Sequence, residues 1–311
     1  MENKPKTQTF KYEHSWSITQ TLDKLIEALR ESWDISISTS GSTGAPKEIL
    51  LPASAMIFSA RNANEFLGAK PGDRWSLLLS PEHTAGLNVL VRSIELGTLP
   101  VTENESAEFT AIVPTQLFRA LNGDAKLLKH LQGCKAVLVG GAAAEVDLLA
   151  KAKAAGINCI TTYGMTETSG GCIYDGTPLP GVEVRIGETI ELKGPMLARV
   201  ELIDGFFVTS DLGKFEDGKL IVLGRADDVI NSGGKKVSLS KVEMALGESF
   251  AAFGTQNSEW GAALNIATTS QMSDEEIQLV LSVKFGVKAL QIYRVSEIPR
   301  TALEKIDRQA L

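Results

Sequence analysis

Cysteine, histidine and long apolar runs are all scarce in this chain of 311 residues. Three cysteines, an odd number without metal-ligand spacing, exclude a disulfide framework and a zinc site. Three histidines are too few for a His-rich metal enzyme. No run approaches the roughly 18 apolar residues of a membrane span, and the N-terminus has no apolar stretch of the signal-peptide type. We therefore expect a cytoplasmic protein with no membrane partner.

Positive charge is also in short supply. Lysine and arginine number 31 against 38 aspartates and glutamates, which gives a formal net charge of −7. Binding to nucleic-acid phosphates needs a basic surface, so no nucleic-acid partner is expected. A hydrophobic fraction of 43% and a charged fraction of 22% are typical of globular proteins. At roughly 150 residues per domain, the length suggests about two domains.

Hydrophobic periodicity predicts a layered α/β fold over the first half of the chain. Helical spacing of apolar residues, or helix-like composition, predicts helices over residues 18–33, 53–67, 87–96 and 146–155. Short β-branched or apolar runs predict strands over residues 35–39, 75–79, 110–113, 136–139 and 157–162. This alternation is typical of a largely parallel sheet with helical layers.

The pattern changes twice after Tyr163. Short β-rich pieces separated by Pro-Gly and Asp-Gly turns predict a small β-subdomain over about 172–223, with strands at 172–174, 182–192, 197–203, 206–209 and 219–223. From Arg225 onward, a helix over 239–250, a strand over 262–267, a helix opened by a capping box at Ser273–Glu276 and a strand over 290–295 predict a compact α+β unit. The expected domains are residues 1–224, with α/β layers to about 163, and residues 225–311.

The segment from Thr39 to Lys47 carries the strongest chemical signal. It reads Thr-Ser-Gly-Ser-Thr-Gly-Ala-Pro-Lys after a short strand. Glycines let backbone N–H groups converge on an anion, hydroxyls add donors, and a lysine adds positive charge, so the composition predicts a phosphate cradle. Pro46 before the lysine excludes the P-loop of kinases and GTPases, and no G-x-G-x-x-G follows the first strand as in a dehydrogenase. The expected phosphate-binding residues are Thr39, Ser40, Gly41, Ser42, Thr43, Gly44 and Lys47.

Six motifs in order resemble those of adenylate-forming enzymes, the family of acyl-CoA synthetases, nonribosomal adenylation domains and firefly luciferases. The resemblance runs from about residue 35 to the end of the chain. The motifs are the segment 39–47, Pro81–Gly86, Tyr163–Glu167, Thr209–Gly213, Gly224–Asp228 running on to Gly233-Gly234, and Pro299–Arg308. The family joins a carboxylate to AMP from ATP, and both reactants are anionic, so a site of this kind must supply positive charge and hydrogen-bond donors.

The resemblance implies a role for the segment around Tyr163. It places the Tyr163 ring against adenine, Thr166 on the α-phosphate as a catalytic residue, and Glu167 on Mg²⁺, which is usually held by one or two carboxylates plus phosphate oxygens. The other face of the adenine slot would be formed by Gly140, Gly141 and Ala142. The remaining nucleotide-binding residues expected here are Thr162, Gly164 and Met165.

The resemblance also implies residues for the ribose and the acid. Asp211 would accept hydrogen bonds from both ribose hydroxyls, because an ionised carboxylate offers two acceptor oxygens, and Arg225 would contact ribose or phosphate. His83 would lie near the substrate carboxylate. The expected wall of the acid pocket consists of His83, Ser169, Gly170 and Gly171.

Near the C-terminus, Lys305 is the expected catalytic cation, carried by a mobile domain. The resemblance makes Asp227 the hinge of that domain and gives Gly233 and Gly234 to the coenzyme A tunnel that serves the second half-reaction. The chain departs from the family pattern at three positions: Glu304 replaces the usual glycine before the lysine, Ser210 replaces glycine, and Lys235 replaces glutamate.

Within the family, the short region before the phosphate segment is typical of compact o-succinylbenzoate–CoA ligases of menaquinone and phylloquinone biosynthesis. Residues 113–117, 161–176 and 179–184 also resemble that group. The implied substrates and cofactors are an aromatic carboxylic acid, ATP, Mg²⁺ and coenzyme A. Dimers are common in the family, which makes a homodimer one candidate assembly, although the sequence alone does not fix the oligomeric state. Two alternatives stay open: a ligase for another aryl or acyl acid, and a nucleotide-binding homologue without catalysis.

Overall fold

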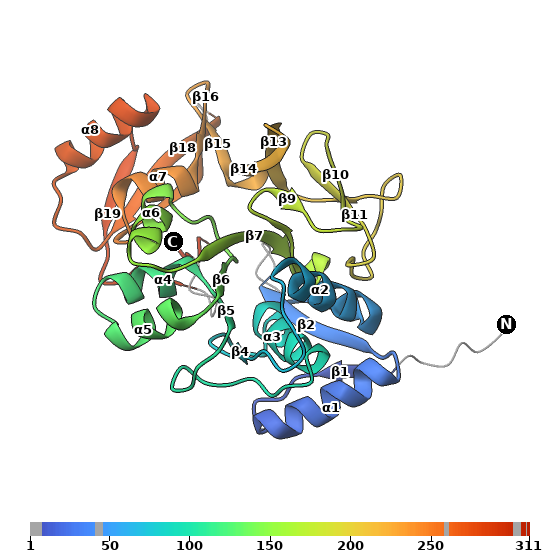
Figure 1. Ribbon diagram of the computed structural model, residues 1–311. Helices are drawn as coiled ribbons and strands as arrows, with labels where there is room; N and C mark the ends of the chain where they lie inside the picture. The colour runs from blue at the N-terminus through green and yellow to red at the C-terminus, as the bar shows by residue number, and fades with distance from the viewer. Residues whose placement is uncertain (1–7, 41–45, 258–260, 301–305, 309) are drawn as a thin grey trace. The chain divides into compact units, whose positions relative to one another are not determined.

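The computed structural model describes residues 8–40, 46–257, 261–300, 306–308 and 310–311 (Figure 1). The chain divides into two compact units. The first comprises Met1–Arg185, Glu191–Val208 and Phe215–Ile221, and the second comprises Ile186–Ile190, Thr209–Lys214 and Val222–Leu311.

A six-stranded sheet forms the centre of the first unit. Its strands, in spatial order, are β4 (Trp75–Ser76), β5 (Phe109–Ile112), β6 (Ala136–Val139), β7 (Cys159–Met165), β8 (Gly170–Tyr174) and β9 (Thr177–Pro178). The strands from β4 to β7 pair in parallel, whereas β8 and β9 are added antiparallel. The expectation of an α/β fold with a largely parallel sheet is confirmed.

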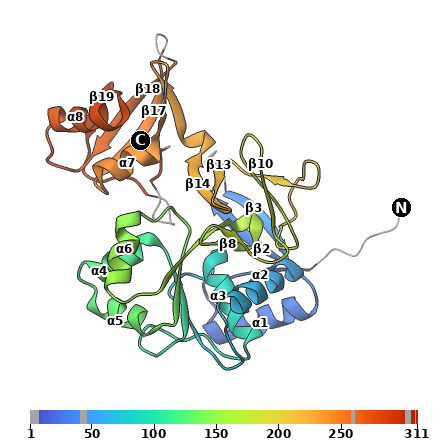
Figure 2. The same ribbon diagram turned by 45° about the horizontal axis from the view of Figure 1, so that its top comes forward.

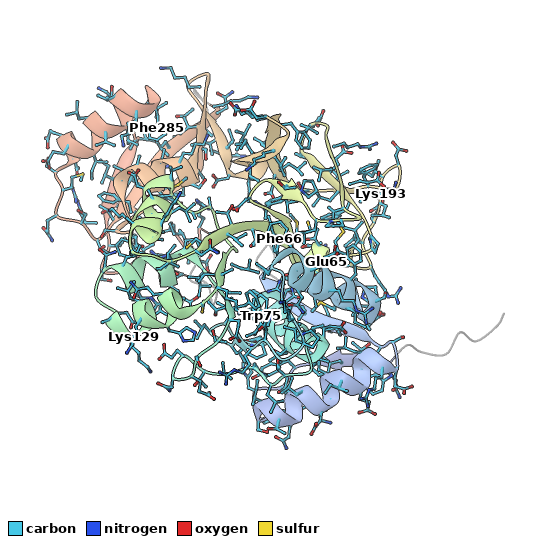
Figure 3. All side chains as sticks on the ribbon, viewed as in Figure 1. Glu65, Phe66, Trp75, Lys129, Lys193 and Phe285 are labelled. Carbon is cyan, nitrogen blue, oxygen red and sulfur yellow. The ribbon has the colours of Figure 1, made fainter. Side chains whose placement is uncertain are left out.

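Helices cover both faces of the parallel part. One group is α2 (Ala53–Phe66) and α3 (Thr84–Glu95); the other is α4 (Pro114–Leu121), α5 (Ala125–Gly133) and α6 (Val146–Ala154). Alternate residues of β6 face the two groups: Ala136 and Leu138 join a core with the fully buried Trp75, labelled in Figure 3, whereas Val137 and Val139 join the core of α4, α5 and α6. This alternation follows from the two-residue period of a strand, and it explains why every residue of β6 is apolar.

A smaller sheet precedes this one, formed by β1 (Thr9–Lys11), β2 (Asp34–Ser40) and β3 (Pro46–Pro52). The helix α1 (Ile18–Arg30) begins at a capping box on Ser17 and packs against the sheet (Figure 2). This helix was expected to reach residue 33, but Ser32 has a positive φ of 55°, which ends it earlier. The strand β3 was not predicted from the sequence.

The connecting β-rich region was predicted less well. It contains β10 (Glu183–Ile186), β11 (Ile190–Lys193), β12 (Phe207–Val208), β13 (Asp211–Glu216) and β14 (Lys219–Arg225). The strand expected over 182–192 is thus two strands, and the strand expected over 197–203 is wrong: this stretch has only an isolated bridge at Ile203. Two of its backbone amides bond to two different segments instead of to one neighbouring strand: Ala198 N–H donates to the Glu167 carbonyl, and Arg199 N–H donates to the Leu50 carbonyl.

The second unit contains a five-stranded sheet with two helices. Its elements are β15 (Val229–Ser232), β16 (Lys235–Ser238), α7 (Leu239–Leu246), β17 (Phe250–Asn257), β18 (Gly261–Thr268), α8 (Asp274–Phe285) and β19 (Gln291–Arg294). The capping box predicted at Ser273 is present. The helix expected over 239–250 ends at Leu246, because Gly247 has a φ of +104° and Phe250 already begins β17.

Among the described residues, the longest helices are too short or too polar to cross a lipid bilayer.

Candidate functional site

The two ends of the expected phosphate segment are joined by the hairpin of β2 and β3. Thr39 lies opposite Lys47 in the antiparallel register, and the Thr39 hydroxyl donates to the Lys47 carbonyl at 3.2 Å. Lys47 is exposed. Gly41, Ser42, Thr43 and Gly44 lie outside the described residues, as does the side chain of Ser40. The hairpin therefore brings together the first and last residues of the segment that composition identified.

The glycine turn after β6 lies against β7. The Gly140 N–H donates to the carbonyl of Ile112 at the end of β5, and a Cβ on Gly140 would come within 2.2 Å of the Thr162 hydroxyl oxygen. Only glycine permits this approach. Gly141 follows with a φ of +80°, and Ala142 is exposed. Expected nucleotide-binding residues from two neighbouring strands, Gly140 and Thr162, thus meet at the carboxyl end of the parallel sheet, where α/β proteins bind ligands.

The residues after β7 turn into a short 3₁₀ helix, η1 (Thr166–Thr168). The Thr168 hydroxyl oxygen accepts from the Met165 N–H at 2.8 Å, which fixes the turn. The Thr166 hydroxyl lies 3.1 Å from the Thr84 hydroxyl, at the first residue of α3. Tyr163, Thr166 and Glu167 are all half-buried, so each keeps a surface that a ligand could reach.

His83 precedes α3, next to the Thr84–Thr166 contact. The backbone N–H of His83 donates to the Ser80 carbonyl. The loop packs closely against the helix, because a Cβ on Gly86 would lie 2.2 Å from the same carbonyl oxygen. Burial lowers the pKa of the His83 imidazole, against the opposing charge of Glu82. A neutral ring is therefore favoured near pH 7, and a neutral ring can accept a proton or a hydrogen bond.

Ser169 is fully buried and holds three segments together. Its hydroxyl donates to the Met196 carbonyl at 2.8 Å, and its own carbonyl accepts from the Ser59 hydroxyl at 2.9 Å and from the Asn88 amide at 2.8 Å. Its φ of +51° is left-handed. The Ser169 hydroxyl thus donates its hydrogen bond within the protein. The role left for Ser169 in an acid pocket is to position the backbone of Gly170.

The glycines beside Ser169 are tightly packed. A Cβ on Gly164 would lie 2.1 Å from the Gly170 carbonyl oxygen, and one on Gly170 would lie 2.3 Å from the Asn88 amide nitrogen. Gly171 is less crowded, with its nearest side-chain atom, the Thr162 Cβ, at 3.0 Å. The end of β7 and the start of β8 are therefore a close backbone crossing rather than a flexible turn.

Arg92 is a charged residue that the sequence reasoning missed. It lies on α3, is only 3% exposed, and its guanidinium lies 4.8 Å from the Trp75 ring. One Nη donates to the Tyr174 hydroxyl at 3.3 Å, and Nε has no hydrogen-bond partner among the described residues. A buried cation without a carboxylate partner is costly unless an anion binds it. The signal in the sequence was a single arginine directly after the mostly apolar run Leu87–Val91.

Asp211 and Arg225 belong to the second unit and form an ion pair, with Nη1 at 3.7 Å from Oδ1. Asp211 is buried, and its N–H donates to the hydroxyl oxygen of Thr209 at 3.0 Å. Thr209 itself donates to the Ile190 carbonyl. The two residues expected to bind ribose are thus brought together.

The residues expected for the second half-reaction also lie in the second unit. Gly233 and Gly234 make the turn between β15 and β16, with φ values of +59° and +81°, and both are exposed. Lys235, where the family has glutamate, donates to the Gly286 carbonyl at 2.7 Å. Lys305 and Glu304 lie outside the described residues, and so does the side chain of Asp227.

The donor set at η1 fits a hard cation. Mg²⁺ takes oxygen ligands and is usually held by one or two carboxylates together with phosphate oxygens. The Glu167 carboxylate and the Thr166 hydroxyl are adjacent oxygen donors that a phosphate could join. Within the described ranges, no cluster of three histidine, cysteine, aspartate or glutamate side chains could hold a metal on its own. One carboxylate joined by phosphate oxygens is a ligand set that suits Mg²⁺.

These features define a nucleotide-binding α/β enzyme with its ligand residues at strand ends. The model of the AMP-binding enzyme family matches residues 30–195. The chain belongs to that family.

Among curated relatives, the chain is 37% identical to the probable 2-succinylbenzoate–CoA ligase of Mycobacterium tuberculosis, over 93% of this chain and 88% of the relative. It is 32% identical to the 2-succinylbenzoate–CoA ligase of Escherichia coli, over 67% of this chain but only 51% of that enzyme. In fold, it resembles the o-succinylbenzoate CoA synthetase of Bacillus subtilis in complex with its acyl-adenylate intermediate, with a TM-score of 0.78, 24% identity, and coverage of 88% of this chain and 68% of that chain.

Proposed function

We propose that this chain is an AMP-forming 2-succinylbenzoate–CoA ligase of menaquinone or phylloquinone biosynthesis. In the first half-reaction, a carboxylate oxygen of the acid attacks the α-phosphorus of ATP, and diphosphate leaves. In the second, the thiol of coenzyme A attacks the acyl carbon, its proton is released, and AMP leaves. The products are 2-succinylbenzoyl-CoA, AMP and diphosphate.

The observation that carries the proposal is the meeting of three segments at one edge of the sheet. Gly140, which follows β6, lies against Thr162 of β7. Thr166 lies within hydrogen-bond distance of Thr84, and His83 directly precedes Thr84. The segments expected to bind adenine, α-phosphate and carboxylate are thus neighbours, although they come from residues 83 to 166. Sequence likeness to named 2-succinylbenzoate–CoA ligases, at 37% and 32% identity, supports the choice of acid.

The nucleotide-binding roles are those that the resemblance to the family implies. The segment from Thr39 to Lys47 would take the β- and γ-phosphates, the Tyr163 ring would lie on adenine, and Thr166 would donate to the α-phosphate. Glu167 would hold Mg²⁺, which lowers the charge repulsion between the two anionic reactants. Asp211 would accept hydrogen bonds from the ribose, with Arg225 beside it.

The acid pocket would lie between His83, Gly170 and Gly171. A dicarboxylic acid brings a second negative charge, and Arg92 offers a cation for it, because Nε of this buried arginine has no partner among the described residues. Arg92 is on α3, the helix that begins at Thr84, and lies eight residues further along it, a rise of about 12 Å. We therefore include Arg92 in the acid site.

For the second half-reaction, Asp227 would act as the hinge between domains 1–224 and 225–311, and Gly233 and Gly234 would border the coenzyme A tunnel. Lys305 would serve only the adenylation step, as the cation near the reacting carboxylate and phosphate. Cytoplasmic location and a homodimer remain predictions from the sequence.

The decisive experiment measures both half-reactions with purified protein. Exchange of labelled diphosphate into ATP reports adenylation, and formation of acyl-CoA reports the second step. With Mg²⁺, ATP and 2-succinylbenzoate, we expect exchange, and acyl-CoA once coenzyme A is added. Exchange that occurs only with other aryl or acyl acids would support a ligase of different specificity.

ATP binding without exchange for any acid would support a non-catalytic homologue and overturn the proposal.

The variant Arg92→Met tests the proposed role of Arg92 in the acid site. The expected result is a raised KM for 2-succinylbenzoate and an unchanged KM for ATP. A variant with both constants unchanged would remove Arg92 from the acid pocket.

A further inference from the structure

Residues 196–199, which we call the bridging segment, bind two parts of the first unit that are far apart in the sequence. The Met196 carbonyl accepts from the Ser169 hydroxyl at 2.8 Å, and the Ala198 N–H donates to the Glu167 carbonyl at 2.8 Å. These two hydrogen bonds join residues that are two apart in each segment, so they fix both the position and the direction of the backbone at η1. The backbone of Glu167, the expected Mg²⁺ ligand, is therefore attached to the bridging segment.

Arg199, the last residue of the bridging segment, binds the second part, which is the hairpin of β2 and β3. Its N–H donates to the Leu50 carbonyl of β3 at 2.9 Å, and its Nε donates at 2.7 Å to Oδ2 of Asp34, the first residue of β2. The pairing of the hairpin is continuous from this base to Thr39 and Lys47. A displacement at the base is therefore transmitted along the ladder to both residues.

The ion pair of Asp34 and Arg199 is buried on its acidic side. The Asp34 side chain is 6% exposed, and that of Arg199 is 54% exposed. Within the described part of the chain, Oδ1 of Asp34 has no hydrogen-bond partner, so the carboxylate is bound to Arg199 through Oδ2. Exposed ion pairs contribute little, but a buried carboxylate that loses its cation is strongly destabilised. Asp34 therefore holds the bridging segment against β2.

The two attachments of the bridging segment are close together. Ala198 and Arg199 are consecutive, and consecutive Cα atoms are about 3.8 Å apart. Ala198 is also 7% exposed and belongs to the same core cluster as Ile35 and Leu51 of the hairpin. A shift of the hairpin base is thus passed to the Glu167 carbonyl through a single peptide unit.

We propose that Arg199 is a positioning residue for Glu167. Through the bridging segment, it holds the Glu167 backbone in a fixed relation to the hairpin whose Thr39 and Lys47 are expected to serve the β- and γ-phosphates. The inference rests on the proposed function, in which Glu167 holds the Mg²⁺ that accompanies those phosphates. Loosening Arg199 should therefore weaken the contribution of Mg²⁺ to nucleotide binding.

The acid pocket should be spared by the same change. Ser169, which positions the pocket residue Gly170, has two attachments outside the bridging segment: its carbonyl accepts from the Ser59 hydroxyl at 2.9 Å and from the Asn88 amide at 2.8 Å. These contacts remain when Arg199 is replaced. The expected defect is therefore specific to the metal, which a general loss of structure would not be.

The first measurement is calorimetric binding of ATP to the full chain in the absence of acid, with and without Mg²⁺. The ratio of the two dissociation constants gives the gain in affinity that the metal provides. We expect a clear gain in wild type, loss of most of it in Glu167→Gln, and a reduced gain in Arg199→Met. An unchanged gain in Glu167→Gln would remove the metal from Glu167 and refute the inference with it.

The second measurement is diphosphate exchange at varied free Mg²⁺. In Arg199→Met, the Mg²⁺ concentration for half-maximal exchange should rise about tenfold, as when groups that support metal ligands are removed. The KM for 2-succinylbenzoate should stay unchanged. Arg199→Lys should recover most of the shift, because the contact with Asp34 uses a single donor and not the two-pronged geometry that only arginine provides.

A double variant separates the link from stability. Arg199→Met leaves the buried Asp34 carboxylate without its cation, and the double variant Asp34→Asn, Arg199→Met removes that charge. We expect the double variant to regain most of any melting temperature lost by Arg199→Met. It should keep the raised Mg²⁺ requirement, because the bridging segment is still not tied to β2.

Arg61→Met is the matched control, because Arg61 also contacts one carboxylate oxygen through Nε, that of Glu95 at 2.5 Å, elsewhere in the first unit. It should leave both measurements unchanged, and a shift equal to that of Arg199→Met would refute the inference. Absence of exchange in wild type would refute the proposed function itself. If wild type is active, the role of Arg199 is refuted by normal Mg²⁺ dependence in Arg199→Met, by an equal rise in KM for the acid, or by return of normal Mg²⁺ dependence in the double variant along with its stability.

Discussion

In the first unit, the segments expected to bind the nucleotide and the acid touch through glycines, uncharged hydroxyls and backbone carbonyls. In the second unit, the chain around Arg308 is held by ionised side chains. Gly140 meets Thr162, and Gly164 meets Gly170, at separations that leave no room for a methyl group. Arg308, in contrast, bridges two carboxylates.

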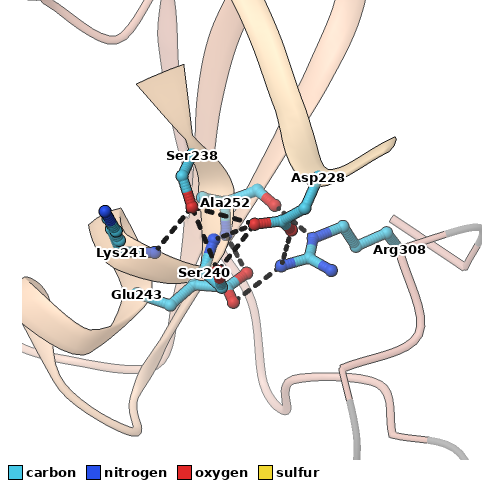
Figure 4. A network of polar contacts seen from close by, with 7 residues as sticks. All are labelled: Asp228, Ser238, Ser240, Lys241, Glu243, Ala252 and Arg308. Carbon is cyan, nitrogen blue, oxygen red and sulfur yellow. Dashed lines mark hydrogen bonds and ion pairs between the residues drawn. The ribbon is translucent and has the colours of Figure 1, made fainter. Parts of the chain in front are cut away.

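The difference has a physical meaning. Anionic substrates need backbone donors brought close together, and close packing without side chains gives fixed geometry at no cost in charge. In the second unit, Arg308 has two mostly buried carboxylate partners, Asp228 and Glu243 (Figure 4), and a buried ion pair resists separation because each charge needs its partner. The first unit should therefore be sensitive to added volume, and the second to changes of charge.

The largest effect should come from Gly164→Ala. The new Cβ would lie 2.1 Å from the Gly170 carbonyl oxygen, a backbone atom that cannot rotate away. We expect a loss of about 3 kcal/mol in the free energy of unfolding, together with loss of diphosphate exchange. Urea unfolding and the exchange assay measure the two. Gly133→Ala, which meets no atom within 4 Å, is the control and should change stability by less than about 0.5 kcal/mol. Equal stability of the two variants would contradict the close approach of the backbone at Gly164 to that at Gly170.

Gly140→Ala should have a smaller effect, because its Cβ would meet a side-chain atom, the Thr162 hydroxyl oxygen, at 2.2 Å. Threonine has few rotamers in a strand, so the relief is incomplete and the loss should be about 1–2 kcal/mol. The double variant with Thr162→Ala removes the obstructing atom and should regain most of that stability in thermal unfolding. A double variant that is less stable than both single variants would show that another contact is responsible.

A smaller effect is expected from Glu243→Gln, and it depends on pH. Burial raises the pKa of the Glu243 carboxyl above 4.5, although Arg308 opposes the shift. A raised pKa means that the folded state binds the proton more tightly than the unfolded state, so Glu243 adds stability as pH falls through its folded pKa. Relative to Glu243→Gln, wild type should therefore gain stability between pH 7 and pH 4.5. Parallel stability curves in urea titrations across this range would contradict the assignment.

The smallest effect concerns the cysteines, all three of which lie in the first unit. Burial raises the pKa of Cys134 and of Cys159 to about 11, and that of Cys172 to about 12. At pH 7 about one thiol in ten thousand is then ionised at the first two sites, and thiolate is the reactive form. Iodoacetamide should leave native activity unchanged. In a urea series followed by mass spectrometry, labelling should rise only as the first unit unfolds. Rapid labelling without urea would show that these thiols are not protected.

The sequence predicted regular elements well where one periodicity dominated. The apolar strand β6 and the capping box at Ser273 are examples of local signals: α8 was expected from its cap, and α1 from its apolar spacing. The helix α7 was predicted too long, because Gly247 ends the helix and a new strand begins at Phe250, the last residue of the expected helix. The strand predicted over 197–203 was wrong because amides in this stretch bond to different distant segments, and no local sequence pattern reveals such contacts.

At the candidate site, the sequence identified residue types and order, but contacts came from the fold. The pairings Thr39–Lys47 and Asp211–Arg225 lie within segments that the motifs already named. Arg92 was missed because an arginine in an amphipathic helix is usually exposed, and only packing against Trp75 makes it buried.

Local chemistry in the sequence predicted a phosphate-binding segment from glycine, hydroxyl and lysine at 39–47, and the motif at 163–167 carried a resemblance that implied a nucleotide and Mg²⁺ site. These depend on composition over a few residues, so they can be recognised without a fold. Tertiary structure alone decided that Ser169 is a buried support, that Arg92 is a buried cation, and that Arg308 is anchored beside Asp228. Each of these depends on contacts between residues far apart in the chain, and such contacts leave no spacing in the sequence.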